Sequence, residues 1–314
     1  MSFDMIIGHE NVKFQINNSI KQQRFSHAHI IVGEDGIGKS FIARETAVEI
    51  LGKCEDKQYA DIVEFKLAKG KKSIGIDEIK SIIEETNKKP YEGNKKVIIV
   101  YNADKITETA QNAFLKTIEE PPKGIFIILL CEKLELILDT IKSRCQTYKL
   151  NRLSEKEIIQ FIESKFTNLP EEELKSIIAF SDGIPGRAEK FVNDNSLKEI
   201  RDTTINVLKA LSKSNLEEIL HNEDFFVKYK NEWQEVLTCM LAYIRDVLVY
   251  KETSNRDLII NIDKIEDIKD MTEMFSFNKL NGIINTIKDT RIKMEKNVNS
   301  ILVFDSMLFK MQEV

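Results

Sequence analysis

The stretch that decides the fold is Gly33-Glu34-Asp35-Gly36-Ile37-Gly38-Lys39-Ser40. It matches the pattern G-x-x-x-x-G-K-[S/T] at every fixed position. A short apolar run, Ala28 to Val32, precedes it, and the segment from Lys39 to Leu51 is typical of a helix that Gly52 ends. A strand, a glycine loop and a helix in this order are the context that a phosphate-binding loop requires. The sequence therefore predicts an α/β domain built around a P-loop.

The fixed residues of this loop are suited to holding the phosphates of a nucleotide. Gly33, Gly36 and Gly38 let backbone N–H groups approach phosphate oxygens, and the following helix N-terminus adds a favourable dipole. Lys39 is expected to contact the β- and γ-phosphates, and the Ser40 hydroxyl to ligate Mg²⁺. The sequence thus predicts ATP or ADP as a ligand, with Mg²⁺ accompanying it.

The acidic residues that a P-loop ATPase uses for hydrolysis are missing from their expected place. In such enzymes an apolar strand ends in Asp, which holds Mg²⁺, often followed by a Glu that orients the attacking water. Here the run Val97 to Val100 is followed by Tyr101 and Asn102. A phenol is a poor Mg²⁺ ligand at neutral pH, and an amide cannot accept a proton from water. Asp104 lies further along, where a role in organising the turn is favoured.

The first half of the chain alternates segments typical of strands and helices. One helix is predicted from four isoleucines that share one helical face: Ile76, Ile79, Ile82 and Ile83. A second is predicted from an N-cap at Thr107 to Glu120, and Pro121 stops it. Continuous apolar strands between helices indicate a parallel sheet covered on both faces. The predicted strands are Ala28 to Val32, Ile62 to Leu67, Val97 to Tyr101, Ile125 to Leu130 and Gln146 to Leu150.

The pattern changes after Leu150. Two helices, Leu153 to Phe166 and Glu171 to Phe180, precede a turn that ends at Gly186. From Ser196 onward the chain has no Pro and a single Gly, and its apolar residues recur at helical spacing, which is typical of a helical bundle. We predict three domains: an α/β P-loop domain (1–150), a small helical lid (151–195) and an all-α collar (196–314).

Composition restricts the class of protein. The 314 residues are 42% apolar and 31% charged, and no run approaches the roughly 18 apolar residues of a membrane span. The N-terminus lacks the features of a secretory signal, so a cytoplasmic protein without a membrane partner is expected. The net charge of −5 argues against a protein that coats nucleic acid, although a local basic patch remains possible. Two lysine clusters are such candidates, but solvated loops are the favoured interpretation: Lys66, Lys69, Lys71 and Lys72, and Lys88, Lys89, Lys95 and Lys96.

The four cysteines indicate neither zinc nor a disulfide framework. Cys54, Cys131, Cys145 and Cys239 show no C-x-x-C spacing and no histidine at metal-ligand spacing. Free thiols fit a reducing cytoplasm. No zinc is expected. His27 and His29 are expected to flank the first strand, without a role in proton chemistry.

Several blocks beyond the P-loop resemble one family. Asn102 to Thr107 and Ala110 to Pro122 are similar to D-E-A-D-x-M-T and A-Q-N-A-L-L-K-T-L-E-E-P-P of the AAA+ clamp-loader family of bacterial DNA polymerase III. Thr140 to Cys145 resembles its S-R-C motif, and Gly183 to Ala188 its sensor-2 turn. Two further segments resemble the family's nucleotide-pocket entry: Ile7-Gly8-His9 and His27-Ala28-His29. A weak likeness to its collar pattern is found in Asn297-Val298-Asn299 with Leu302.

The resemblance implies a role for Arg144. It would be an arginine finger that acts in trans, reaching the γ-phosphate held by a neighbouring subunit, with Ser143 and Cys145 placing and packing it. The alternative is an ordinary surface ion pair. Arg187 would sense the subunit's own nucleotide, or else only pair locally, and these two interpretations are equally weighted.

Within this family the pattern resembles the delta-prime branch, which carries S-R-C but lacks an intact hydrolytic site. The resemblance implies gamma/tau and delta clamp-loader subunits as partners, and the sliding clamp and primed DNA through the complex. Two departures stand out. Many relatives have a four-cysteine zinc module, whereas this chain offers only Cys54 between Gly52 and Lys66. Relatives carry a polar sensor-1 residue where this chain has Cys131-Glu132-Lys133.

Two other functions remain open from the sequence. The first is a working AAA+ ATPase, such as a gamma-type loader motor, which the complete P-loop favours and Tyr101 and Asn102 disfavour. The second is a P-loop small-molecule kinase, which would need a phosphoacceptor pocket and no partner subunits.

Overall fold

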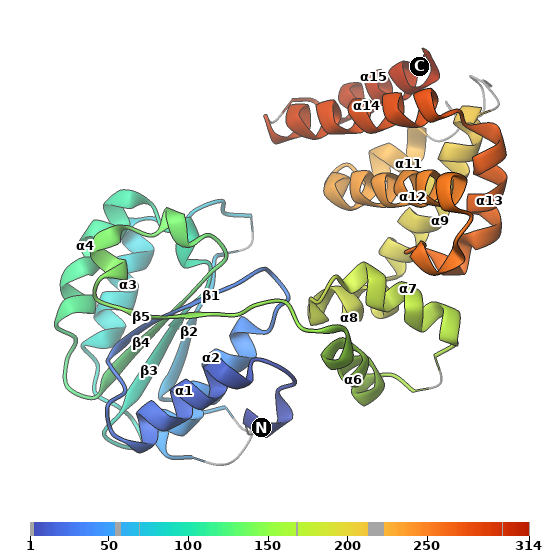
Figure 1. Ribbon diagram of the computed structural model, residues 1–314. Helices are drawn as coiled ribbons and strands as arrows, with labels where there is room; N and C mark the ends of the chain where they lie inside the picture. The colour runs from blue at the N-terminus through green and yellow to red at the C-terminus, as the bar shows by residue number, and fades with distance from the viewer. Residues whose placement is uncertain are drawn as a thin grey trace. The chain divides into compact units, whose positions relative to one another are not determined.

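Figure 1 shows a computed structural model of the chain, which describes residues 3–53, 58–68, 70–167, 169–212, 223–296 and 298–313. The chain divides into two compact units. The first comprises Met1–Ser164 with Gly183–Gly186, and the second Lys165–Asp182 with Arg187–Val314. In the described residues, all strands of the sheet belong to the first unit, and the second unit is built from helices.

The first unit is organised around a five-stranded sheet in the order β2-β3-β4-β1-β5. Every neighbouring pair is parallel, so each connection must cross over, and helices lie on both faces of the sheet. This confirms the predicted α/β class. The strands are β1 (Ala28–Val32), β2 (Ile62–Phe65), β3 (Lys96–Val100), β4 (Ile125–Cys131) and β5 (Gln146–Lys149).

The helices of this part of the chain cover the sheet in two sets. The α-helices are α1 (Glu10–Lys21), α2 (Lys39–Leu51), α3 (Ile76–Thr86), α4 (Glu108–Glu119), α5 (Asp139–Lys142) and α6 (Glu155–Lys165). Short 3-10 turns are η1 (Phe3–Met5), η2 (Ala103–Lys105) and η3 (Leu134–Leu136). Residues of α1 and α2 pack on one face of the sheet, and residues of α3, α4 and α5 on the other.

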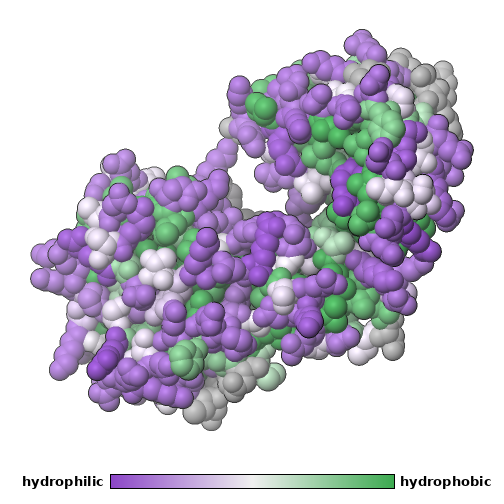
Figure 2. Space-filling view, viewed as in Figure 1, coloured by the Kyte–Doolittle hydropathy of each residue, from purple (hydrophilic) through white to green (hydrophobic). Residues whose placement is uncertain are grey.

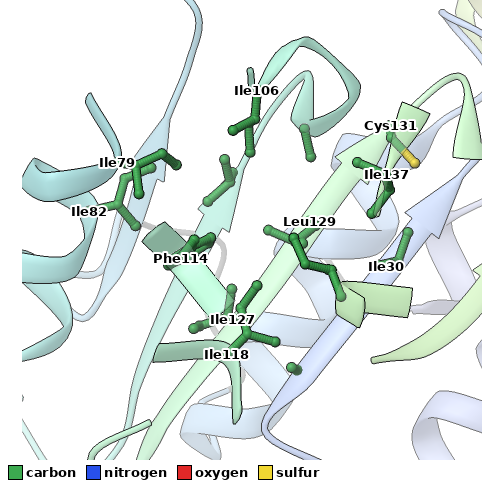
Figure 3. Close-up of a cluster of buried hydrophobic side chains, with 14 of the residues drawn as sticks. Ile30, Ile79, Ile82, Ile106, Phe114, Ile118, Ile127, Leu129, Cys131 and Ile137 are labelled. Carbon is green, nitrogen blue, oxygen red and sulfur yellow. The ribbon is translucent and has the colours of Figure 1, made fainter. Parts of the chain in front are cut away.

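Strand alternation explains how one sheet supplies two cores. On β3, Ile98 and Val100 enter the core under α3 and α4, whereas Val97 and Ile99 enter the core under α1 and α2. Figure 3 shows the first of these cores, with Phe114 and Ile118 of α4 against Ile127 and Leu129 of β4. The three inner strands, β3, β4 and β1, are covered on both faces and are largely apolar, whereas the edge strands β2 and β5 are less buried and include Glu64 and the exposed Lys149.

Several element boundaries follow the sequence closely. β1 and α2 have the predicted ends, and Gly52 adopts φ 68° after α2, the left-handed conformation that favours glycine at a helix end. β2 ends at Phe65, two residues before the predicted end at Leu67. Thr107 occupies the predicted N-cap position of α4, but its side chain makes no capping hydrogen bond.

The second unit is helical, as predicted. Its longest helix, α12 (Trp233–Thr253), contacts α9 (Asn195–Ser212), α13 (Ile265–Met274) and α14 (Phe277–Glu295) and buries Leu237, Met240 and Ile244. Trp233 itself is only partly buried. The remaining elements are α7 (Glu171–Ser181), α8 (Pro185–Asn193), α11 (Glu223–Lys228), η4 (Arg256–Leu258), η5 (Ile262–Lys264) and α15 (Ser300–Glu313).

The three-domain division stays a prediction. The segment predicted as a lid, 151–195, is shared between the two units. Predictions that involve Cys54, Lys69 and Asn297 fall outside the described residues. Among the helices that are described, none is both long enough and apolar enough to cross a membrane. On the face shown in Figure 2, hydrophilic side chains predominate, with apolar side chains scattered among them.

Candidate nucleotide site and arginine finger

The predicted phosphate loop connects the carboxyl end of β1 to the first turn of α2. Gly36 and Gly38 adopt φ 78° and 110°, which residues with a Cβ rarely adopt. Gly38 is the N-cap of α2, and no side chain caps this end of the helix. The first N–H groups of α2 are therefore available to phosphate oxygens, where the helix dipole favours negative charge.

A glycine-to-glycine contact closes one side of this loop. The N–H of Gly186 donates to the carbonyl of Gly36 at 2.9 Å. A Cβ placed on Gly186 would lie 2.6 Å from the Gly36 Cα, and one on Gly36 would lie 3.1 Å from the Gly186 Cα. Only glycine fits at Gly186 without displacing backbone. The segment predicted as a sensor-2 turn thus reaches the phosphate loop through its own main chain.

Lys39 is folded back on the loop. Its Nζ donates to the carbonyls of Gly33 and Glu34, both at 2.8 Å. Burial lowers the pKa of Lys39, and the negative charges of Glu132 and Asp35 oppose this shift. To contact a phosphate, the ammonium group would exchange these two carbonyls for phosphate oxygens.

A tyrosine and an ion-pair cluster occupy the place where catalytic carboxylates belong. Tyr101 follows β3 and is partly buried, and burial, reinforced by the negative charge of Glu64, raises the pKa of its phenol. Arg44 of α2 binds both carboxylate oxygens of Glu64 on β2. Lys66 also pairs with Glu64 at 3.1 Å, and its Nζ lies 4.7 Å from the centre of the Tyr101 ring. Two cations therefore share one carboxylate here, and neither Tyr101 nor Asn102 can act as a base.

Asp104 occupies a position that the sequence did not anticipate. Its Oδ1 is buried and has no hydrogen-bond partner among the described residues. The turn-organising role favoured from the sequence is therefore not fulfilled by this oxygen. The charge of Asp104 influences the pKa of both Lys39 and Cys131, so the carboxylate belongs to the same region as the phosphate loop.

The predicted sensor-1 region begins with a buried thiol. Cys131 ends β4 and is buried, and burial raises its pKa to about 12, so the thiol stays protonated at neutral pH. Glu132, which follows, is exposed.

The histidines near the site have structural contacts. The His9 Nε2 lies 3.0 Å from the carbonyl of Ile37 in the phosphate loop, and burial lowers the His9 pKa. His29 is buried on β1 and stacks on Phe25, and burial lowers its pKa to about 4. The His27 Nε2 lies 2.9 Å from the carbonyl of Ile118 on α4. His27 thus precedes β1 as expected, whereas His29 lies within the strand.

Arg144 lies in the turn between α5 and β5 with its side chain 36% exposed. Its Nη1 donates to the Thr140 carbonyl at 2.9 Å, and its Nη2 to Glu119 Oε1 at 3.1 Å. The next residue, Cys145, packs against the core between the sheet and α4, and burial raises its pKa to about 12. The guanidinium is therefore held at the surface by a turn that is anchored in the core.

Two family models together match most of the chain. One, described as "DNA polymerase III, delta subunit", matches residues 8–154, and the other, "DNA polymerase III, delta subunit, C terminal", matches residues 195–313.

The chain belongs to the DNA polymerase III clamp-loader subunit family.

Individual relatives agree with this family. DNA polymerase III subunit delta' of Bacillus subtilis is 26% identical, and the match covers 94% of this chain and 94% of that protein. Subunit tau of the same organism is 22% identical over 98% of this chain, which spans 61% of tau. A gamma subunit-related protein from Thermotoga maritima has a similar fold, with a TM-score of 0.51 at 20% identity over 95% of this chain and 99% of that one.

The P-loop, Tyr101 and Asn102 all follow strands at the carboxyl edge of the sheet, whereas Arg144 is on a separate turn before β5. Arg187 belongs to the second unit, where its Nη1 lies 3.8 Å from Asp182 Oδ2. The distance matches the local ion pair that was one of its two interpretations.

Sequence reasoning missed Gln111 of the clamp-loader subunit. This side chain is 3% exposed; its Nε2 donates to the carbonyls of Ile106 and Leu136, and its Oε1 accepts from the N–H of Leu138. It joins α4 to the segment that leads into α5 and Arg144. Its place on the buried face of α4, beside apolar Phe114, was the available signal, since a buried amide must find partners.

The lysine clusters of the clamp-loader subunit are largely neutralised. Among the described members, Lys66 pairs with Glu64, Lys71 with Glu78, and Lys88 and Lys96 both with Glu85, while Lys95 donates to the Ile50 carbonyl. These contacts favour the solvated-loop interpretation over a DNA-binding patch for the exposed lysines, but that interpretation is wrong for Lys96, which is 4% exposed on β3. Within the described ranges, no group of His, Cys, Asp and Glu is placed to hold a metal ion.

Proposed function

We propose that this chain is a delta-prime-like subunit of the bacterial replicative clamp loader, which helps to load the sliding clamp onto primed DNA. It donates an arginine finger to a neighbouring subunit and has little or no ATP hydrolysis of its own. The observation that carries the proposal is a complete phosphate loop with Tyr101 and Asn102 in the two positions where carboxylates belong. The similarity to Bacillus subtilis delta' over 94% of both chains supports it.

The proposed nucleotide site takes ATP or ADP. Gly33, Gly36 and Gly38 supply the close backbone approach, Lys39 the positive charge, and Ser40 the hydroxyl ligand for an accompanying Mg²⁺. The residues present fit a phosphate group, because the N-terminus of α2 has no side-chain cap. When bound, the nucleotide stabilises the fold by mass action, without turnover.

The proposed finger is Arg144. A guanidinium is permanently charged and planar, so it can stabilise charge that develops on transferring phosphoryl oxygens. The side chain is on the surface, and the next residue, the partly buried Cys145, packs against the core. This combination of exposure and rigid backbone is what a residue acting on another subunit requires.

The proposed assembly is a hetero-oligomer with gamma/tau and delta subunits, acting in the cytoplasm. The lid (151–195) and the collar (196–314) are proposed as separate domains, and the collar as the oligomerisation domain. Leu302 and Phe309 on α15 are 64% and 49% exposed, which is consistent with a helix face that packs against another subunit. The sliding clamp and primed DNA are reached through the complex.

The test is an Arg144→Ala variant in the reconstituted clamp loader. ATP hydrolysis at the adjacent site is expected to fall by at least about tenfold, because trans arginine fingers contribute large factors. Lys149→Ala is the matched control, since Lys149 is an exposed cation on the adjoining strand β5. An Arg144→Ala loader that hydrolyses ATP as fast as the Lys149→Ala loader refutes the finger.

One observation favours a second candidate, an ATPase that hydrolyses its own nucleotide. Asp104 places a buried, unpartnered carboxylate oxygen in the region of Lys39. Turnover by the purified chain at a rate that Lys39→Ala abolishes supports this candidate and contradicts ours. The third possibility, a small-molecule kinase, is disfavoured by membership of the clamp-loader family.

A further inference from the structure

We infer that Glu119 is a positioning residue for the Arg144 finger. It holds the guanidinium in the orientation in which Arg144 contacts the γ-phosphate bound by a neighbouring subunit. This inference rests on the proposed function of Arg144. Glu119 is the last residue of α4, and its Oε1 accepts from Arg144 Nη2 at 3.1 Å. Thr140 on α5 accepts from Nη1 at 2.9 Å. Acceptors from two different helices thus fix both terminal nitrogens of one guanidinium.

The backbone that carries Glu119 is firmly held. The preceding residue, Ile118, is fully buried in the core shown in Figure 3. Its carbonyl lies 2.9 Å from the His27 Nε2, at the start of β1. Pro121, two residues after Glu119, cannot continue the helix. The carboxylate therefore projects from a point with little freedom to move.

The backbone that carries Arg144 is anchored in the same core. The Arg144 N–H donates to the carbonyl of Ile141, which is 1% exposed and belongs to the cluster that contains Ile118. The neighbouring Cys145 packs on this cluster as well. Because both partners extend from one rigid core, the ion pair fixes a direction in space for the guanidinium.

Helix stability does not explain an acid at this position. The C-terminus of a helix carries a partial negative charge, so Glu119 is placed unfavourably with respect to the dipole of α4. The pair is also exposed, at 36% for Arg144 and 53% for Glu119, and exposed ion pairs contribute little to folding. What remains is orientation of the guanidinium, which is valuable to a group that must meet a transition state.

The contacts leave the finger free to act. A guanidinium has five N–H donors, and the contacts with Thr140, Ser143 and Glu119 involve only Nη1 and Nη2. Among the described residues the Nε–H has no hydrogen-bond partner, and the side chain is 36% exposed. Arg144 can therefore bind a phosphate oxygen while Glu119 still holds it.

The experiment is a double-mutant cycle in the reconstituted clamp loader. Glu119→Ala is expected to lower the kcat for ATP hydrolysis about three- to tenfold, with an unchanged KM for ATP, because a mobile arginine meets the transition state less often. Glu119→Gln keeps an acceptor oxygen and is expected to restore most of the rate. In an Arg144→Ala background, Glu119→Ala is expected to cause no further loss. Glu120→Ala is the control, since Glu120 is the adjacent exposed carboxylate.

Each outcome decides between the possibilities. A rate unchanged by Glu119→Ala, or equal to that of Glu120→Ala, overturns the positioning role while leaving Arg144 as the finger. If Glu119→Ala lowers the hydrolysis rate by the same factor in the unaltered loader and in the Arg144→Ala loader, the positioning role is also overturned. The effect of Glu119 then does not depend on Arg144. If Arg144→Ala itself leaves hydrolysis unchanged, the proposed function fails, and that result is separate from the Glu119 comparison.

Discussion

Replacing Gly186 with alanine tests whether the phosphate loop depends on a main-chain contact from far along the chain. The added Cβ would lie 2.6 Å from the Gly36 Cα and 3.0 Å from the Gly36 carbonyl oxygen. Both atoms are backbone, so no side chain can rotate away, and the two segments must separate. Separation lengthens the hydrogen bond from the Gly186 N–H to the Gly36 carbonyl, now 2.9 Å.

The magnitude follows from these two effects. Inserting a methyl group into a closed contact costs about 1–3 kcal/mol, and losing the hydrogen bond costs about 1 kcal/mol. We expect the free energy of unfolding to fall by about 2–4 kcal/mol, which lowers the midpoint temperature of a unit of this size by roughly 4–16 °C. Nucleotide affinity is expected to fall as well, because the loop that binds the phosphates is displaced.

The assay is thermal unfolding with and without ATP or ADP, with equilibrium nucleotide binding measured in parallel. Gly93→Ala is the matched control, because a Cβ there meets nothing within 4 Å and the φ angle is ordinary. This control is expected to be neutral or slightly stabilising, since alanine reduces the freedom of the unfolded chain. If Gly186→Ala unfolds at the same temperature as Gly93→Ala and binds nucleotide equally well, the proposed dependence of the loop on this contact is refuted.

Two further predictions concern pH and Asp104. Burial lowers the pKa of His29 from 6.5 to about 4. Between pH 6.5 and pH 4 the unfolded chain therefore binds a proton at His29 that the folded chain does not bind. The free energy of unfolding falls as the pH drops through this range. The loss of unfolding free energy approaches about 3 kcal/mol. In His29→Gln, the unfolding free energy measured with urea should depend less on pH between pH 7.5 and 5. A pH dependence equal to that of the unaltered protein contradicts the assignment. Asp104→Asn is expected to leave any ATP hydrolysis by the purified chain unaltered. A clear fall in turnover, with nucleotide affinity retained, would instead identify Asp104 as a carboxylate that takes part in hydrolysis.

The parts of the fold that were predictable from sequence are those encoded locally. The ends of β1 and α2 followed from an apolar run, a glycine loop and Gly52, all within one short segment. β2 was predicted too long because it is an edge strand: its pairing with β3 ends at Phe65, and that limit depends on the partner strand. Local pattern cannot show where a partner stops.

The parts of the site that escaped prediction are contacts between distant segments. The ion pair of Arg44 with Glu64, the contact of Gly36 with Gly186, and the pair of Glu119 with Arg144 each join residues from different elements. The sequence identified Arg144 only through resemblance to a family motif, and it gave no reason to connect it with Glu119. Composition and periodicity predict elements, whereas pairs of this kind depend on how the elements pack.

The geometry of the phosphate loop explains how it can remain complete in a subunit proposed not to hydrolyse. Its residues have structural contacts as well as potential phosphate contacts: Lys39 binds two loop carbonyls, and Gly36 accepts a hydrogen bond from Gly186. Catalytic carboxylates after β3 would make no such structural contacts with the loop. In their place, Tyr101 lies beside Arg44, Glu64 and Lys66. Loss of the acids therefore removes no contact of the loop, whereas loss of Lys39 or Gly36 would remove contacts that shape the loop itself. On this reasoning, Lys39→Ala should lower stability even without nucleotide, and restoring an acid at Tyr101 should disturb the Arg44–Glu64 pair before it restores any catalysis.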